Sequence, residues 1–165
     1  MSKVQKLQDQ GCIVLVDQRF EPVIIVSFCG AVSEKLLREF IAWYRGYLMS
    51  LQAGGKFVMI NDPSRVTVHL PGNRKVGAEE LKKLSPLMEL HQLDNILVID
   101  NALLRGALTA VGWLLGSKKV GTLVKDMPEA ITTALRALTS RGLAVPAGLD
   151  VNYQAQLPAV QKRAG

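Results

Sequence analysis

The fold is decided by two short runs near the amino end of the chain, Cys12-Ile-Val-Leu-Val16 and Val23-Ile-Ile-Val-Ser-Phe28. Both runs are rich in β-branched residues, and the segment between them, Asp17 to Pro22, is rich in charged and turn-forming residues. This pattern predicts an antiparallel hairpin. Nearly every position in both runs is apolar, so we expect both faces of the sheet to be covered by helices.

The register of this hairpin decides how the cysteines of the chain are placed. A hairpin centred between Phe20 and Glu21 puts Cys12 directly opposite Cys29. The two interpretations are a redox pair and two buried thiols, and the second is favoured because free cysteine behaves as a small hydrophobe in cores.

Helical patterns follow further along the chain. The first predicted helix begins at the capping residue Ser33 and ends at Gly54-Gly55. The second covers Glu79–His91, with a bend or restart at Pro86, and the third covers about Ala102–Leu115. The fourth runs from Asp126 to near Gly142. The first has its apolar residues in one stripe, which comprises Leu36, Leu37, Phe40, Ile41, Tyr44 and Leu48. The last combines the D-x-x-E capping spacing of Asp126 and Glu129 with a proline in the first turn.

Between these helices the sequence predicts strands at Lys56–Ile60, Asn95–Asp100 and Val120–Val124. The segment Ser64–Gly77 is interpreted as a loop, because Pro71-Gly72-Asn73 has strong turn chemistry. A short strand at Val66-Thr67-Val68 is the alternative.

The alternation predicts an α/β fold, a single domain over residues 11–143 with a mixed, mostly parallel five-stranded sheet, an N-terminal antiparallel hairpin and about four helices. We expect residues 1–10 to be a polar N-terminal segment and residues 144–165 a mobile or surface-draped tail. No apolar run approaches the roughly 18 residues of a membrane span, and residues 1–10 are too polar for a signal peptide. A cytoplasmic protein without a membrane span is therefore expected.

The chain carries a net charge of +6 and has a pI near 9.5. Its cations are dispersed in pairs such as Arg74-Lys75 and Lys118-Lys119, which long neutral stretches separate. Because phosphate contacts need clustered Lys and Arg, this distribution favours a solvated basic surface over a nucleic-acid partner.

The residue patterns of common active sites do not occur in this sequence. Gly54-Gly55-Lys56 precedes a strand and not a helix, so it does not match a phosphate-binding loop. His69 and His91 have no metal-ligating neighbours, and no G-x-S-x-G nucleophile elbow is found. We therefore expect no enzymatic activity, cofactor or metal, and a structural, hydrogen-bonded His91.

The segment at the carboxyl end of the third predicted strand is the first candidate site. Ligands and partners of open α/β sheets meet the chain at such ends. A partner-docking region is predicted there from Asp62, Ser64, Arg65, Val66 and Arg74. The alternative is an Asx-type turn at Asp62 that only fixes the strand exit.

The second candidate is a stripe on the predicted apolar helix. Arg105, Thr109, Gly112 and Gly116 share one helix face, where small residues permit close approach. A partner or homodimer surface and intramolecular packing both explain this stripe, and packing is favoured. A groove for a lipid-like ligand near Trp113 is a further alternative.

The order of elements, the Asp62-x-Ser64-x-Val66 exit and the run from Asn101 to Ala110 resemble STAS-like domains, which include anti-sigma-factor antagonists and the carboxyl-terminal domains of sulphate transporters. The Leu103–Trp113 stretch is similar to a bacterial subgroup. The resemblance implies a module that docks onto a regulatory partner, often under control of a phosphorylated serine. The family's serine-containing loop is replaced here by His69-Leu70-Pro71-Gly72, so that switch is not expected.

The sequence thus favours a non-enzymatic regulatory or scaffold-like protein-binding module in bacterial signalling. A binding domain for a lipid-like or other hydrophobic small molecule is the alternative.

Overall fold

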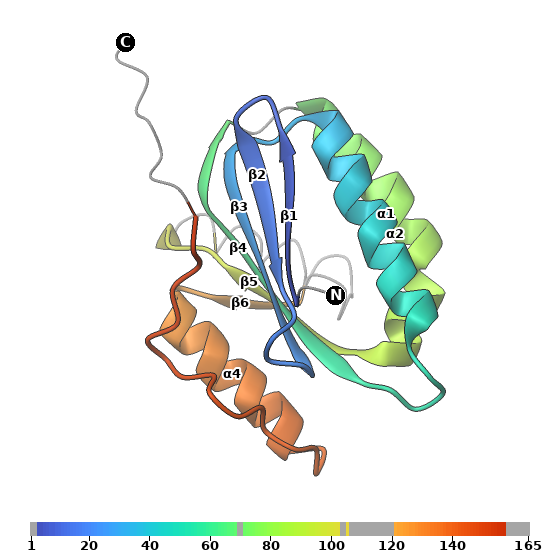
Figure 1. The fold of residues 1–165 in the computed structure, drawn as a ribbon, viewed down its shortest axis with the longest axis vertical. Coiled ribbons are helices and arrows are strands. Elements are labelled where there is room, and N and C mark those ends of the chain that lie inside the picture. Colours follow the sequence, from blue (N-terminus) through green and yellow to red (C-terminus); the bar gives the residue numbers. More distant parts are fainter. Residues whose placement is uncertain (1–2, 69–70, 103–104, 106–120, 158–165) are drawn as a thin grey trace.

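Six strands form one sheet in the order β1-β2-β3-β4-β5-β6 in this computed structural model, which describes residues 3–68, 71–102, 105 and 121–157 (Figure 1). The strands are β1 (Val4–Asp9), β2 (Cys12–Asp17), β3 (Val23–Ala31), β4 (Phe57–Val68), β5 (Gln92–Val98) and β6 (Thr122–Val124). The helices within the described ranges are α1 (Glu34–Ser50), α2 (Pro71–His91) and α4 (Met127–Thr139). Strands β1 to β3 pair antiparallel, and β3 to β6 pair parallel.

The α/β class and the mixed sheet with its N-terminal antiparallel hairpin are confirmed. The predicted count of five strands is wrong, because residues 4–9 form a sixth strand and not a polar segment ahead of the sheet. In β1, Leu7 packs on the core while Lys6 and Gln8 are exposed, a half-polar pattern that suits an edge strand. Three helices are described where about four were predicted, since the one expected over about 102–115 lies almost wholly outside the described residues.

Helices cover both faces of the sheet, as the apolar strands predict. Figure 1 shows α1 and α2 on one face and α4 on the other. Alternate residues of β3 accordingly enter two different apolar clusters, with Ile24 and Val26 on the α1 side and Val23 and Ile25 on the α4 side. This alternation follows from the two-residue period of a strand.

Local capping confirms where α1 and α4 begin. The Ser33 side chain accepts a hydrogen bond from the Leu36 N–H, and Asp126 accepts one from the Glu129 N–H. The Glu129 carboxylate in turn accepts from the Lys125 N–H, so the contacts are reciprocal, as in a capping box. The predicted stripe of α1 is confirmed at its buried positions, which are Leu36, Phe40, Ile41, Tyr44 and Leu48.

The predicted loop at Ser64–Gly77 is wrong, since β4 continues to Val68 and α2 already begins at Pro71. The long β3 supplies pairing partners for β4 as far as Val68. For that reason β4 continues beyond the end of its own apolar run. Pro71 is tolerated at a first helical position, where its missing N–H would have no helical partner. The helix then continues through Pro86 without restarting.

The hairpin between β2 and β3 is shifted by one residue from the predicted register. Ile13, and not Cys12, pairs with Cys29. A shift of one residue moves a side chain to the other face of the sheet, so Cys12 joins the cluster on the α1 side and does not face Cys29. Both cysteines are buried free thiols.

Candidate functional site

Four of the five predicted docking residues lie together on the carboxyl half of β4. Strand β5 pairs with β4 only as far as Asn61, and in the described part of the chain the residues from Asp62 onward pair with β3 alone. Ser64 and Arg65 are exposed, and Asp62 and Val66 are half-buried. The structure therefore presents these side chains along an extension of the sheet beyond its neighbouring strand.

This extension is irregular where it leaves β5. The register with β3 shifts between Ser27 and Cys29, opposite Pro63 and Ser64. The Asp62 Oδ1 accepts a hydrogen bond of 3.0 Å from the Ser64 N–H, which confirms the Asx-type contact, although within a strand and not in a loop. Such bulges change the direction in which side chains point.

The fifth docking residue, Arg74, lies in the first turn of α2, and its side chain is outside what the structure describes. Arg105 lies near the carboxyl end of β5, where its guanidinium donates hydrogen bonds to the carbonyl oxygens of Ile99 and Asp100. The cation of the predicted stripe thus contacts its own chain. The remaining stripe residues, Thr109, Gly112 and Gly116, lie outside the described residues.

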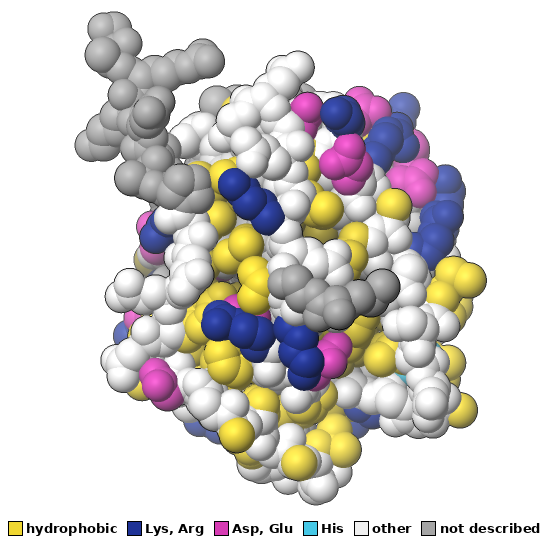
Figure 2. Space-filling view, in the orientation of Figure 1, with side chains coloured by type: hydrophobic (Ala, Val, Ile, Leu, Met, Phe, Trp, Pro, Cys, Tyr) yellow, Lys and Arg dark blue, Asp and Glu magenta, His cyan; other side chains and the backbone are white. Residues whose placement is uncertain are grey.

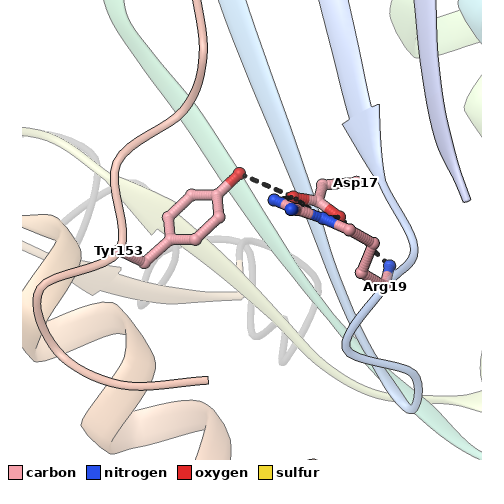
Figure 3. A network of polar contacts seen from close by, with 3 residues as sticks. All are labelled: Asp17, Arg19 and Tyr153. Atoms are coloured by element: carbon pink, nitrogen blue, oxygen red, sulfur yellow. Dashed lines mark hydrogen bonds and ion pairs between the residues drawn. The ribbon is translucent and has the colours of Figure 1, made fainter. Parts of the chain in front are cut away.

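A polar network around a buried carboxylate, which sequence reasoning missed, joins the β2–β3 turn to the carboxyl-terminal segment (Figure 3). Asp17 is 1% exposed and closes β2. Arg19 donates to its carboxylate from Nη2 at 2.7 Å, from Nε at 3.0 Å and from its backbone N–H at 3.0 Å. The Tyr153 hydroxyl donates to the same carboxylate, at 3.1 Å from Oδ2.

Aromatic contacts surround this network. The rings of Phe20 and Tyr153 meet edge to face with centroids 5.8 Å apart, and the Arg19 guanidinium lies 5.2 Å from the centroid of Phe20. Leu149, which is 7% exposed, belongs to the apolar cluster under α4 together with these rings. The contact between Asp17 and Arg19 has a local signal in the sequence, since the acid ends a predicted strand and the arginine follows two residues later. The contact with Tyr153 has no such local signal.

The electrostatics of the network favour the charged carboxylate. Burial by itself raises the pKa of Asp17, but the hydrogen bonds from Arg19 and Tyr153 outweigh it, and the pKa lies below its ordinary 3.8. The pKa of Tyr153 is raised by burial and by the negative charge of Asp17. At neutral pH the Asp17 carboxyl group is therefore ionised, and the Tyr153 hydroxyl keeps the proton that it donates to it.

Replacing Asp17 with asparagine is expected to lower the free energy of unfolding by about 2 kcal/mol at pH 7, because Arg19 and Tyr153 lose a charged acceptor. A carboxylate with a lowered pKa stabilises the fold above its ordinary value, and this contribution is lost as the pH falls below about 3.8. Urea unfolding of both proteins from pH 7 to pH 3 measures this difference. A difference in the free energy of unfolding that stays constant from pH 7 to pH 3 would contradict a lowered pKa of Asp17.

His91 has the structural role predicted for it. It is 4% exposed, and its Nδ1–H donates a 2.8 Å hydrogen bond to the Gly55 carbonyl oxygen. His69 lies outside the described residues. Within the ranges that the structure describes, no group of three or more His, Cys, Asp or Glu side chains is placed to hold a metal ion.

Charged side chains of both signs are mixed over α1 and α2 (Figure 2). Lys83 contacts Glu80 at 2.6 Å, and Arg45 lies 3.5 Å from the same carboxyl group. The shallow cleft beside them holds about 120 Å³ and is lined by Arg38, Ile41, Ala42, Arg45 and Glu80. Pockets for drug-sized ligands hold about 300–1,000 Å³, so this cleft is small for such a molecule.

The fold and the site define an α/β protein whose sheet extends at β4 beyond its neighbouring strand. No helix among the described residues has both the length and the apolar character needed to cross a bilayer. Neither the models of known protein families nor the sequences of curated proteins match this chain.

Proposed function

We propose that this chain is a non-enzymatic, regulatory or scaffold-like protein-binding module of STAS-like type that acts in bacterial signalling. Its docking region is the carboxyl half of β4, together with the start of α2. The observation that carries the proposal is the stretch from Asp62 to Val68, which β3 holds on one side while Ser64, Arg65 and Thr67 are exposed.

A strand held on one side suits recognition for an entropic reason. Pairing with β3 fixes the backbone before a partner arrives, so little conformational entropy is lost on binding. Pro63 and the register shift beside it disfavour uncontrolled pairing along the edge of β4 that no described strand occupies. Contacts with side chains, and not strand addition, therefore carry the docking that we propose.

Arg65 defines the chemistry of the partner. Its exposed guanidinium can bind a carboxylate through two parallel hydrogen bonds. The net charge of +6 attracts acidic surfaces over longer distances. The proposed partner is accordingly a protein that presents an acidic patch.

Charge reversal at Arg65 tests the docking region. The partner is first identified as the protein that the wild type retains in a pull-down from lysate. Arg65→Glu is expected to weaken binding of this partner by roughly tenfold or more, because a like charge then faces the acidic patch. Titration with the purified partner gives the dissociation constants. Arg74→Glu is expected to act in the same direction.

Arg141→Glu is the matched control, since it makes the same change of charge at an exposed residue beyond the end of α4. It is expected to bind as the wild type does. If Arg65→Glu and Arg74→Glu bind as tightly as Arg141→Glu, the docking region lies elsewhere on the protein.

A further inference from the structure

Residues 143–157, here called the strap, are attached to the rest of the fold mainly by side chains. Figure 1 shows this segment turning back along α4 and continuing beside the sheet. Its backbone hydrogen bonds within the described chain are local, such as Leu143 N–H to Leu138 O and Tyr153 N–H to Asp150 O. A segment held in this way has lower local stability than the strands it covers.

Among the residues that the structure describes, the strap makes a polar contact with the sheet through the hydrogen bond from Tyr153 to Asp17. Breaking it does not leave an unpaired buried charge, because Arg19 continues to donate to both carboxylate oxygens of Asp17. Detachment of the strap therefore costs one hydroxyl hydrogen bond and the apolar contacts of Leu143, Leu149 and the Tyr153 ring. A buried acid without such a second partner would make the same movement far more costly.

The strap is preceded by a glycine with open space around it. Gly142 has a φ of +68°, follows the end of α4 at Thr139, and has open space around the position of a Cβ atom. The strap reaches the sheet at Asp17, which ends β2, and only β3 lies between β2 and β4, the strand of the proposed docking region. An open strap therefore changes the surface beside β4.

We infer that the strap opens as a unit about Gly142 and that the Tyr153–Asp17 hydrogen bond is the latch that holds it closed. Opening uncovers Phe20 and the neighbouring apolar side chains of the α4-side cluster, and it alters the surroundings of Asp62. That this movement regulates docking rests on the proposed function, whereas the latch itself does not.

Tyr153→Phe tests the latch without any partner. The substitution removes only the hydroxyl, keeps the ring against Phe20 and keeps an aromatic cleavage site for chymotrypsin. Under native conditions, cleavage at Leu149 and at residue 153 is expected to become roughly tenfold faster, because a hydrogen bond to a charged acceptor is lost. Tyr44→Phe, which removes a hydroxyl bonded to Gln92 on the other side of the sheet, is the matched control and is expected to be cleaved in the strap at the wild-type rate.

The inference is overturned if Tyr153→Phe is cleaved in the strap at the wild-type rate. It is equally overturned if cleavage within β2 or β3 rises as much as cleavage in the strap, since the strap would then not open separately. Binding of the purified partner separates the two proposals. If Tyr153→Phe is cleaved faster in the strap but binds the partner as the wild type does, the latch is supported and its regulatory role is rejected. If Arg65→Glu binds the partner as the wild type does, the docking region alone is rejected.

Discussion

Gly121→Ala is expected to lower the free energy of unfolding by about 4 kcal/mol. A Cβ atom at this position would lie 2.0 Å from the carbonyl oxygen of Asn95, and the φ of Gly121 is +78°. Backbone atoms of β5 cannot move aside without disturbing the pairing of β5 with β4. Urea unfolding followed by circular dichroism measures the loss.

Gly142→Ala separates the clash from the backbone strain. Its φ is also positive, at +68°, but nothing lies within 4 Å of a Cβ atom there. Only the cost of the left-handed conformation, about 1–2 kcal/mol, is expected. Equal losses for the two variants would show that the close approach of Gly121 to Asn95 is not a constraint.

Phe57→Ala is expected to cost about 3–5 kcal/mol, because it leaves a cavity at the start of β4. The Phe57 ring is fully buried and meets the edges of two rings of α1, with centroids 6.4 Å from Tyr44 and 5.2 Å from Tyr47. These contacts join the parallel part of the sheet to the helix that covers it. The same urea titration measures the change.

Met49→Ala is the control for side-chain loss at a surface position. Met49 is 70% exposed on α1, so its removal is expected to change stability by no more than about 0.5 kcal/mol. A cost below about 1.5 kcal/mol for Phe57→Ala would mean that the cluster closes over the lost ring, contrary to the tight packing described here.

The strap reaches the sheet through Tyr153 at the end of β2, and β3 separates β2 from the proposed docking region on β4. The ring of this tyrosine belongs to the cluster under α4, while its hydroxyl faces Asp17 and lies within the electrostatic reach of Asp62. Under the proposed function, this arrangement would give the module a means of control within its own chain.

The elements predicted correctly are those whose signals are local. Ser33 and Asp126 cap helices a few residues away, and the apolar stripe of α1 repeats within one helix. The predicted strand at Lys56–Ile60 likewise matches the start of β4, although the residues from Asp62 to Val66 that were placed after it lie within the same strand.

The errors concern features that depend on a distant partner. Strand β1 is half polar and forms because β2 offers it an edge, and β4 extends to Val68 because β3 is long enough to pair with it. The register that separates Cys12 from Cys29 differs from the predicted one by a single residue, which the composition of the turn does not decide.

The sequence by itself determined the α/β class, the hairpin and the starts of α1 and α4, since each depends on the spacing of residues that are neighbours in the chain. The predicted end of the first helix at Gly54-Gly55 is wrong, because α1 already ends at Ser50. Only the tertiary structure decided the strand count, the reach of β4 beyond β5 and the contact between Asp17 and Tyr153, which are 136 positions apart. Pairing register and buried polar contacts depend on which surfaces meet after folding, and no local pattern of residues encodes that meeting.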